Sequence, residues 1–458
     1  MVHQTMNTNS SRAPRASSSS SVMGQGAGGV GWSRTWPAGL ALALAACGTP
    51  APVATPGDTT VPAESAPAPA VPAPVPAPPS GSAATAEALD DTRAEPVLAP
   101  QHPIWRWADA APLPPPLPRG KALWQPVRYR DLPGWGTDAL HDVWDAWLRS
   151  CERPAAPWGA LCPEIRRLTL ADAETRHVWV MRHWQPYRVL ATDGSAPAGL
   201  LTGYYEPELP ARRQRDAVHR VPLYAPPPAL AAAAGQPWRT RRQIDADPQV
   251  QALLAPHALA WLADPLDALL LHIQGSGRLR LTEPDGQVRL VRLAFAAHNG
   301  HPYQSVMRTL LQRGEIREGT WEALRAWAAA NPQRVEELLW TNPRVVFFRE
   351  EPLDALAAQA GPRGAQGVAL TPGRSVAVDR DAVPYGTPLW LVSSGPVARL
   401  RRLVVAQDTG AAIVGAARAD FFTGWGEQAY PLAAGLKQPL QLWALWPRAQ
   451  PLPPPPAE

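Results

Sequence analysis

With 458 residues the chain has room for two or three domains, but many of its 56 prolines lie before residue 120, so we expect a folded part at about residues 120 to 450. The formal net charge is only +4, and lysine occurs only at Lys121 and Lys437. Arginine clusters at 212–215 and 239–242 are most simply solvated loop charges. Because no nucleic-acid-binding module is recognisable, nucleic acid is not favoured as a partner.

The first distinctive stretch is residues 36–46, which read WPAGLALALAA. Eleven residues are too few to cross a bilayer as a helix, and Arg34 precedes them, as is typical of a signal peptide. The run ends at Cys47, and the sequence LAAC resembles a bacterial lipobox, in which the cysteine is lipidated and becomes the new N-terminus. We predict a signal peptide at 1–47, with Met23 as an alternative start, and a membrane anchor on Cys47.

Gly48 follows that cysteine, whereas an aspartate there retains enterobacterial lipoproteins at the inner membrane. The resemblance implies an outer-membrane lipoprotein of a Gram-negative cell that faces the periplasm. Residues 48–118 are rich in proline and alanine, which predicts a disordered, extended tether. At about 3 Å per residue its reach would exceed roughly 100 Å. Residues 451–458 are expected to be a disordered tail.

Two amphipathic helices are predicted next. Thr137 can cap the first, whose apolar residues 140, 143, 144, 147 and 148 have helical spacing. Its tryptophans are expected in the core. The second is expected at about 170–184. Cys151 and Cys162 lie between the two helices, and in an oxidising periplasm a disulfide is favoured. A reactive thiol is disfavoured because no Cys-His arrangement is visible.

From Leu200 short apolar strands alternate with Gly, Pro and Asp turns, which is typical of a barrel or sandwich. A strand is expected at 269–273, followed by Gln274-Gly275-Ser276-Gly277. That turn lacks the glycine spacing of a nucleophile elbow, so Ser276 is not predicted to be a nucleophile. Further helices are expected after Ser305 to about residue 312, at 321–329 and at 335–340, and a strand within 342–348.

His298 and His301 flank a turn, but without an E-x-x-H partner or a cysteine pair they do not favour a metal site. Three aspartates follow at the ends of apolar strands, namely Asp379, Asp408 and Asp420. Apolar strands that stop at an acid deliver the carboxylate to the rim of a cleft, although Asp408 could instead cap a turn.

Seven segments together resemble the membrane-bound lytic murein transglycosylase A family. They are GYYEPEL (203–209), IQGSGRLRL (273–281), NGHPYQSVMRTLLQRGEI (299–316), NPRVVFF (342–348), SVAVDRDAVPYGTPLW (375–390), AQDTGAAI (406–413) and RADFFTGWG (418–426). The last three also resemble a domain named for its three aspartates. The match covers residues 199 to about 430 in the family's order.

The resemblance implies a mainly β fold with accessory helices. A double-psi β-barrel domain, assembled from 119–206 and 353–450, would carry the aspartates. A smaller β-rich substrate domain would be inserted at 207–352, with the glycan in a groove between the two. Periodicity alone predicts only a mixture of strands and helices.

The family cleaves the β-1,4 bond between N-acetylmuramic acid and N-acetylglucosamine in peptidoglycan glycan strands without water, leaving 1,6-anhydro ends. The resemblance implies no cofactor and no metal. One carboxyl acts first as general acid and then as base, so it needs a raised pKa. Partners in complexes that build or degrade the cell wall are a further expectation.

The motif assigns the acid to Asp420, where Ala419, Phe421 and Phe422 could disfavour the charged form. Asp408 is the runner-up and supports it electrostatically, and Asp379 is expected to be structural.

Contacts to sugar groups are expected from five residues, which could equally fix turns: Tyr204, Tyr205, Gln274, Ser276 and Asn299. The family usually has a second glycine where this chain has Ala411, which would be awkward if that position needs positive φ.

Two other functions remain open. Double-psi barrels in expansin-like proteins loosen polysaccharide without cutting it, so a non-catalytic peptidoglycan-binding module is the main alternative. A metal-dependent amidase using His298 and His301 is the other. The release of soluble products and their chemical ends would distinguish the three.

Overall fold

The computed structural model describes residues 89–452. The predicted signal peptide, the lipidation residue Cys47, the tether up to residue 88 and residues 453–458 of the tail lie outside this range. Within it, no helix is both long and apolar enough to cross a membrane.

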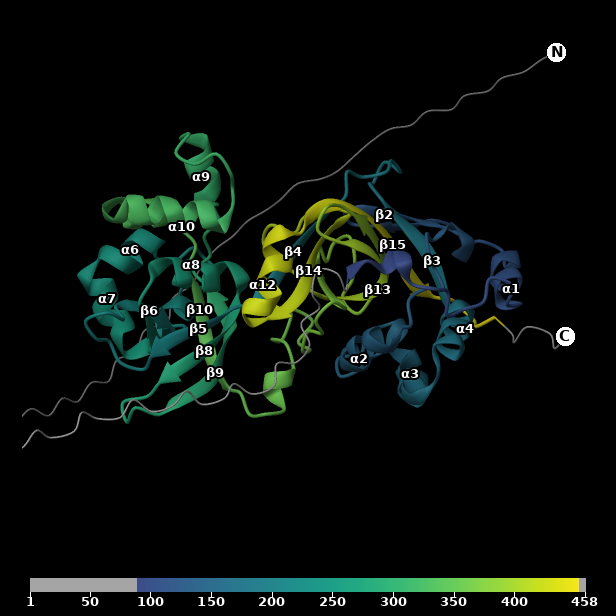
Figure 1. The fold of residues 1–458 in the computed structure, drawn as a ribbon, viewed down its shortest axis with the longest axis horizontal. Helices are drawn as coiled ribbons and strands as arrows, with labels where there is room; N and C mark the ends of the chain where they lie inside the picture. The colour runs from purple at the N-terminus through teal and green to yellow at the C-terminus, as the bar shows by residue number, and fades with distance from the viewer. Residues whose placement is uncertain (1–88, 453–458) are drawn as a thin grey trace, which may run out of the picture. The chain divides into compact units, whose positions relative to one another are not determined.

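The strands of residues 89–452 form two sheets, and Figure 1 labels β2, β3, β4, β13, β14 and β15 of the larger one. Its strands are β1 (Leu117–Arg119), β2 (Ala122–Pro126), β3 (Trp184–Leu190), β4 (Leu200–Glu206), β11 (Ser375–Val378), β12 (Pro388–Ser394), β13 (Arg399–Asp408), β14 (Arg418–Trp425) and β15 (Lys437–Pro447). Its helices are α1 (Ile104–Ala110), α2 (His141–Ser150), α3 (Cys162–Arg167), α4 (Ala173–His183) and α12 (Gly426–Gly435).

This sheet closes on itself. The strand order is β1-β2-β3-β15-β12-β13-β11-β14-β4, and β4 also pairs with β15. The six strands from β15 to β4 therefore form a closed barrel, from which β3, β2 and β1 extend. Two of the pairings are parallel, β11 with β13 and β14 with β4. The predicted mainly β fold built around a double-psi β-barrel is confirmed.

The smaller sheet is formed by the chain between β4 and β11, in the order β10-β9-β8-β5-β7-β6. Its strands are β5 (Glu208–Arg212), β6 (Val221–Tyr224), β7 (Ala258–Leu262), β8 (Ser276–Thr282), β9 (Val288–His298) and β10 (Val346–Pro352). The helices of this part are α5 (Pro228–Ala232), α6 (Arg241–Ala246), α7 (Pro248–Leu254), α8 (Pro265–Gln274), α9 (Val306–Gln312), α10 (Trp321–Ala330) and α11 (Val335–Trp340).

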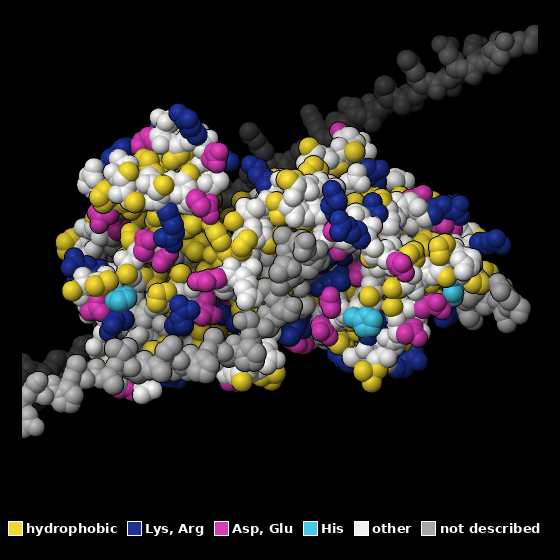
Figure 2. Space-filling view, in the orientation of Figure 1, with side chains coloured by type: hydrophobic (Ala, Val, Ile, Leu, Met, Phe, Trp, Pro, Cys, Tyr) yellow, Lys and Arg dark blue, Asp and Glu magenta, His cyan; other side chains and the backbone are white. Residues whose placement is uncertain are grey.

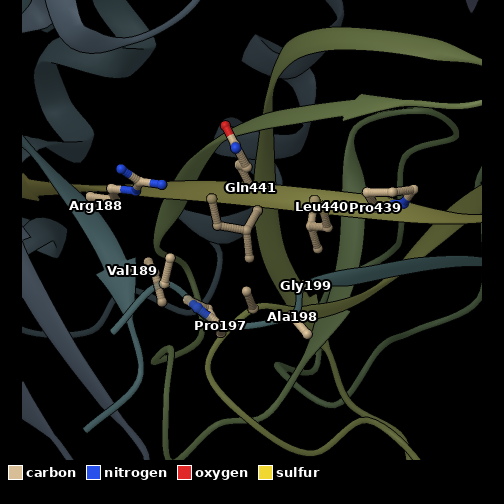
Figure 3. Close-up of a pocket in the computed structure, with 11 residues that line it drawn as sticks. Arg188, Val189, Pro197, Ala198, Gly199, Pro439, Leu440 and Gln441 are labelled. Carbon is tan, nitrogen blue, oxygen red and sulfur yellow. The ribbon is translucent and has the colours of Figure 1, made fainter. Parts of the chain in front are cut away.

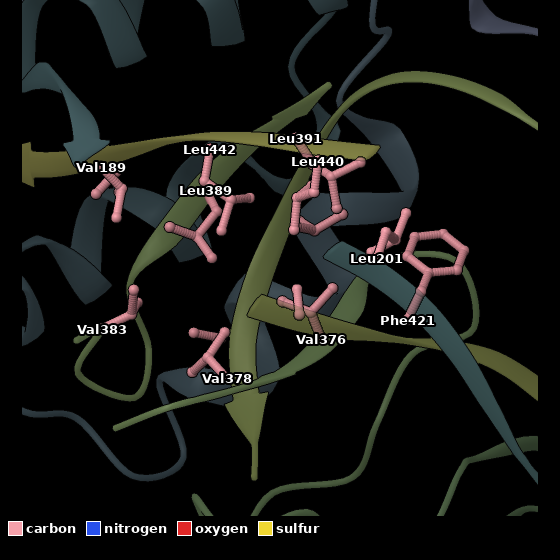
Figure 4. Packing of buried hydrophobic residues seen from close by; sticks show 14 of the residues in the cluster. Val189, Leu201, Val376, Val378, Val383, Leu389, Leu391, Phe421, Leu440 and Leu442 are labelled. Carbon is pink, nitrogen blue, oxygen red and sulfur yellow. The ribbon is translucent and has the colours of Figure 1, made fainter. Parts of the chain in front are cut away.

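Two buried clusters stabilise the barrel part. The first fills the barrel, where alternate residues of its strands point inward, as Figure 4 shows for Val376, Val378, Leu389 and Leu442. The second lies where α2 and α4 pack on the outside of the strands (Figure 1), and it contains Trp144 and Trp147. The prediction that these tryptophans belong to the core is confirmed.

The strand predicted at 269–273 is wrong, because these residues lie inside helix α8. Asp264 accepts a hydrogen bond from the backbone N–H of Leu266, Pro265 begins the helix, and Gly275 ends it in the left-handed conformation. The apolar run is buried on nearly every side, so its periodicity does not separate helix from strand. The Asp-Pro start and the glycine end were the informative signals.

The cap predicted for α2 is also wrong. The helix begins at His141, after Leu140 in the left-handed conformation (φ 59°), and the hydroxyl of Thr137 donates instead to Gly134. The helix predicted at 170–184 begins at Ala173 because Asp172 caps it, which leaves Leu170 97% exposed.

The predicted tether extends too far into the chain. Residues 89–118 include α1 and β1, and Leu89, Leu98 and Ile104 are at most 2% exposed. Asp91 accepts hydrogen bonds from Arg402 on β13. A few apolar anchors and one acidic residue therefore fix a segment whose proline content resembles that of a disordered linker.

Cys151 and Cys162 form a disulfide that joins the end of α2 to the start of α3, with 5.6 Å between their Cα atoms. They are 11 residues apart, so the bond removes about 2 to 3 kcal/mol of loop-closure entropy from the unfolded chain. We expect the Cys151→Ser/Cys162→Ser variant to lose about that much free energy of unfolding, measured from its urea midpoint. Wild type kept reduced should reproduce the loss, and an unchanged midpoint would refute the expectation.

Candidate active site

Two of the three aspartates lie in one row across neighbouring barrel strands. Ala377 on β11 is the register partner of Asp408 on β13 and also of Asp420 on β14. Asp420 is in turn the partner of Thr202 on β4. Since adjacent strands are about 4.8 Å apart, the Cα atoms of the two acids are roughly 10 Å apart, with a small alanine between them. The barrel thus brings together acids that are separated by a loop in the sequence.

Asp420 is a partly buried carboxyl that favours the protonated form. Burial raises its pKa to about 6, and the charge of Asp408 acts in the same direction, whereas the Thr202 hydroxyl and Arg418 oppose the shift. Thr202 donates to Oδ1 at 2.6 Å. Oδ2 has no partner among the described residues and is not sealed from solvent. The carboxyl therefore has one anchored oxygen and one oxygen available to a ligand.

Asp408, at the end of β13, has both oxygens occupied. Oδ1 accepts from the backbone N–H of Ala365 at 2.8 Å, and Oδ2 accepts from the Tyr204 hydroxyl at 2.9 Å. Burial raises its pKa, while these hydrogen bonds work against the shift. A carboxylate that accepts two hydrogen bonds is held in place but has no free oxygen for proton transfer.

Tyr204 interacts with both acids, through a hydrogen bond to Asp408 and through the charge of Asp420. Burial raises the pKa of its hydroxyl well above the usual range, and the charges of both Asp408 and Asp420 add to the effect. Its ring packs on Phe422, 5.3 Å between centroids. The preceding Gly203 allows α12 to lie close to β4, since a Cβ there would be 2.8 Å from the Cα of Ala433.

Asp379 has a different environment. It follows β11, is only 6% exposed, and its Oδ2 receives hydrogen bonds from the Lys121 ammonium (3.1 Å) and the backbone N–H of Gly415 (2.8 Å). Although burial works in the opposite direction, these bonds lower its pKa. A carboxylate held charged in this way ties the loop before β14 to the N-terminal part of the barrel, a structural role.

The residues predicted to contact sugar are not equivalent. Asn299 is fully buried, and its amide bonds to backbone groups of Arg239, Pro343 and Val345, so it fixes the turn, which was the alternative reading. Tyr205 is 8% exposed and packs in a cluster with Tyr430.

Gln274 accepts from the backbone N–H of Tyr205 at 3.2 Å, which connects the end of α8 to β4. Ser276, at the start of β8, is 7% exposed. Of the five predicted residues, Tyr204 alone has a hydrogen bond to one of the three aspartates in the described chain.

Sequence reasoning missed a buried ionic cluster at the junction of the two sheets. Glu206, the last residue of β4, is 0% exposed and pairs with Arg278 at 2.8 Å and Arg292 at 2.5 Å. Both arginines also donate to the backbone carbonyl of Ala360, and Arg278 lies over the ring of Trp425. The sequence did contain a signal for this cluster. Glu206 is a charged residue at the end of an apolar strand, and arginines follow in the next distinctive motif.

Thr202 and Arg418 were also missed as partners of Asp420. Arg418 lies two residues before Asp420 on β14, and such residues share one face of a strand. That periodicity could have placed Arg418, but the pairing of β14 with β4 could not be read from the sequence.

Ala411 does not have positive φ; Leu140 and Ala234 are the non-glycine residues with positive φ in the described chain. The alanine is therefore unstrained, and the concern about this position is removed.

The two histidines do not lie in a ligand cluster. His298 accepts from the backbone N–H of Gly300, and His301 bonds to the carbonyl of Trp238. Within residues 89–452 no three potential metal ligands come together. The face shown in Figure 2 has basic and acidic side chains interspersed.

A cavity of about 360 Å³ lies at the start of β4 and β14. It is lined by Arg188, Val189, 196–199, Ala417 and 439–442, and Figure 3 shows its loop residues beside β15. None of the three aspartates lines it, so the cavity is separate from the candidate active site.

Comparison with known proteins agrees with this architecture. The chain matches the MltA specific insert domain at residues 200–349 and the 3D domain at residues 374–446. Membrane-bound lytic murein transglycosylase A of Escherichia coli (strain K12) is 32% identical over 254 residues, which cover 53% of this chain and 64% of that protein. The match thus spans less than two thirds of the relative's length.

Two solved structures are similar over most of their length. MltA from Neisseria gonorrhoeae, in a monoclinic form, has a TM-score of 0.60 and 28% identity, covering 79% of this chain and 100% of that one. E. coli MltA with bound chitohexaose has a TM-score of 0.57 and 26% identity, covering 71% and 94%. With its closed barrel, its second sheet and both domain matches, the chain belongs to the membrane-bound lytic murein transglycosylase A family.

Proposed function

We propose that the protein is a lytic transglycosylase that cleaves the β-1,4 bond between N-acetylmuramic acid and N-acetylglucosamine in peptidoglycan, with Asp420 as general acid and then general base. The observation that carries this proposal is the state of Asp420. Its pKa is raised to about 6, and one of its oxygens is free while the other is anchored. Such a carboxyl can hold a proton near neutral pH and return to the same state after each turnover.

The reaction needs a single carboxyl. The proton of Asp420 moves to the glycosidic oxygen as the C1–O4 bond breaks, and its electron pair stays on O4 of the leaving sugar. The C6 hydroxyl of the muramic residue then attacks C1, and its proton passes to the Asp420 carboxylate. The products are a free 4-hydroxyl and a 1,6-anhydro end, and no water is consumed. The paired carboxylates of ordinary glycoside hydrolysis are therefore not required.

Asp408 and Asp379 have supporting roles in this proposal. The charge of Asp408, held by Tyr204 and Ala365, raises the pKa of Asp420 and would stabilise positive charge that develops at C1. Asp379 holds the loop before β14 through Gly415. Neither residue transfers a proton.

The glycan would lie in a groove between the barrel domain (119–206 with 353–450) and the inserted domain (207–352). Tyr204 is the contact best supported by its position beside both acids, and Gln274 and Ser276 lie at the α8–β8 turn of the inserted domain. That E. coli MltA has been solved with bound chitohexaose supports a glycan ligand for this chain.

Attachment to the membrane would be through a lipid on Cys47, with the protein in the outer membrane and facing the periplasm. The membrane-bound relatives support an anchor. A long tether would carry the barrel toward the cell wall, where complexes that build or degrade peptidoglycan are candidate partners.

Mass spectrometry of the products released from purified sacculi tests the function. Muropeptides ending in 1,6-anhydromuramic acid are expected, and reducing muramic ends would instead indicate a hydrolase. Binding to sacculi with no soluble product would favour the expansin-like alternative. Activity lost to a chelator would favour the metal-dependent amidase.

The pH dependence of the reaction follows from Asp420. Because the free enzyme must carry the proton, kcat/KM should fall about tenfold per pH unit above about pH 6. Initial rates of anhydro-product release between pH 4 and 8.5 measure this fall, which is the alkaline limb of the pH profile. A rate that stays constant up to pH 8 would show that Asp420 is not the group that donates the proton.

A further inference from the structure

A short chain of hydrogen bonds ends on one oxygen of Asp420. The guanidinium of Arg418 donates to the Thr202 hydroxyl oxygen at 2.9 Å, and that hydroxyl donates to Asp420 Oδ1 at 2.6 Å. Arg418 also donates to the backbone carbonyls of Leu200 and Ala419, which fixes it against β4 and β14. Three side chains on two paired strands therefore have one defined arrangement.

The direction of this chain follows from what each group can donate. Arginine has only donors, so the Thr202 oxygen must accept from Arg418. The single hydroxyl hydrogen of Thr202 then has Asp420 Oδ1 as its acceptor, and the described chain offers it no other. If Oδ1 carried the carboxyl proton, Thr202 would have to donate to a hydroxyl oxygen, which is a weaker acceptor than the carbonyl oxygen that Oδ1 becomes when the proton is on Oδ2. The proton of neutral Asp420 therefore belongs on Oδ2.

We propose that Arg418 and Thr202 are positioning residues that keep the proton of Asp420 on Oδ2, so that donation and return both use the one oxygen that faces the substrate. This inference rests on the proposed function. Beyond that function, it assigns the proton to Oδ2 of Asp420 and gives a role to two residues that do not touch the substrate.

The proposal is consistent with each step of the reaction. When the Oδ2–H bond breaks and the proton moves to the glycosidic oxygen, negative charge appears on the carboxylate, and the bond from Thr202 to Oδ1 strengthens. When the C6 oxygen attacks C1, its proton returns to Oδ2. Oδ1 stays anchored throughout, so the carboxyl need not rotate between the two halves of the reaction.

Thr202→Val tests the proposal because it keeps the shape and removes the hydroxyl. We expect kcat to fall about ten- to a hundredfold, since a hydrogen bond to a charged group is lost, with little change in KM. The hydroxyl also lowers the pKa of Asp420, so its loss should move the alkaline limb of the pH profile to higher pH. Thr202→Ser should restore both kcat and the wild-type limb.

Thr423→Val is the matched control. This threonine is on the same strand as Asp420, and its hydroxyl bonds to the backbone carbonyls of Tyr204 and Ala429. Its loss can lower stability, but the alkaline limb should remain where it is in wild type. Arg418→Met is the second variant, and it should move the limb in the same direction as Thr202→Val because Arg418 also lowers the pKa of Asp420.

The outcomes separate this inference from the function on which it rests. If wild type releases no 1,6-anhydro products, the proposed function itself fails. If wild type releases them but both Thr202→Val and Arg418→Met keep the wild-type kcat and pH limb, only the positioning role fails. A limb that moves equally in Thr423→Val would also overturn it, because the effect would then be structural. Urea midpoints of all variants establish that folded proteins are compared.

Discussion

Asp420→Asn is expected to lower the release of 1,6-anhydromuropeptides from purified sacculi by about a thousandfold, because the amide can neither donate nor regain the proton that both steps of the proposed mechanism need. The substitution keeps the shape of the side chain and the acceptor for Thr202. Product release is followed by mass spectrometry beside wild type. Full activity in Asp420→Asn would remove Asp420 from the mechanism.

Two other substitutions are compared with Asp420→Asn, the first as a control and the second as a test of the two proposed roles. Asp381→Asn removes a carboxylate that is 57% exposed, near Lys121, and should leave the rate nearly unchanged. Asp408→Asn should lower the rate less than Asp420→Asn, since in the proposed mechanism Asp408 supplies a supporting charge and Asp420 is the proton donor. If Asp408→Asn were the more damaging change, the two roles would have to be exchanged.

The free energy of unfolding of Asp420→Asn shows whether the inactive variant is folded. The pKa of Asp420 is raised to about 6, compared with 3.8 in a model compound, so ionising it in the folded state costs free energy. That cost is absent below about pH 4, grows between pH 4 and 6, and is fully present above pH 6. At pH 7.5 Asp420→Asn should therefore be as stable as wild type or more so, by at most about 3 kcal/mol.

Glu206→Gln is expected to lower the free energy of unfolding by about 3 to 5 kcal/mol, because two buried guanidinium groups lose the only carboxylate that pairs with them in the described chain. Urea unfolding at pH 7 measures the change. Glu208→Gln is the matched control. It lies two residues further on, and its pairing with Arg280 is partly exposed, so its loss should cost less than about 1 kcal/mol.

A Glu206→Gln midpoint no lower than that of Glu208→Gln would contradict this account of the junction. Because β4 also carries Thr202 and Tyr204, we expect Glu206→Gln to reduce activity even where the protein remains folded. The buried cluster then links the stability of the sheet junction to the geometry of the acid.

Local sequence signals located many helices and strands. They failed where a segment is buried on most sides, because polar and apolar residues then do not alternate. Helix α2, which has a clear polar face, and helix α4, which Asp172 caps, lie within a few residues of their predicted positions. The sequence of helix α8 predicts a strand because the helix is apolar on most of its surface, so the contrast on which periodicity depends is missing. The proline content of residues 89–118 predicts a tether, because the sequence does not show that a few apolar residues of this segment are buried.

The sequence by itself identified the acids that lie along the apolar strands, although its prediction that all three are at strand ends is wrong for Asp420, which is the third residue of β14. It identified Asp379, Asp408 and Asp420, and the resemblance of their motifs assigned the acid to Asp420. It could not separate the three by environment, because a carboxyl's pKa depends on burial and on charges that folding brings near. It also could not distinguish Asn299 as a turn residue from Asn299 as a ligand.

Only the tertiary structure decided those points, and the reason is the pairing of strands that are distant in the sequence. Closure of the barrel places Asp408, Ala377, Asp420 and Thr202 in one row, although they come from four strands. In the folded chain one oxygen of Asp420 is free, both oxygens of Asp408 accept hydrogen bonds from Tyr204 and Ala365, and Asp379 is paired with Lys121. Hydrogen bonds across more than 200 residues of chain therefore distinguish three aspartates that look equivalent in the sequence.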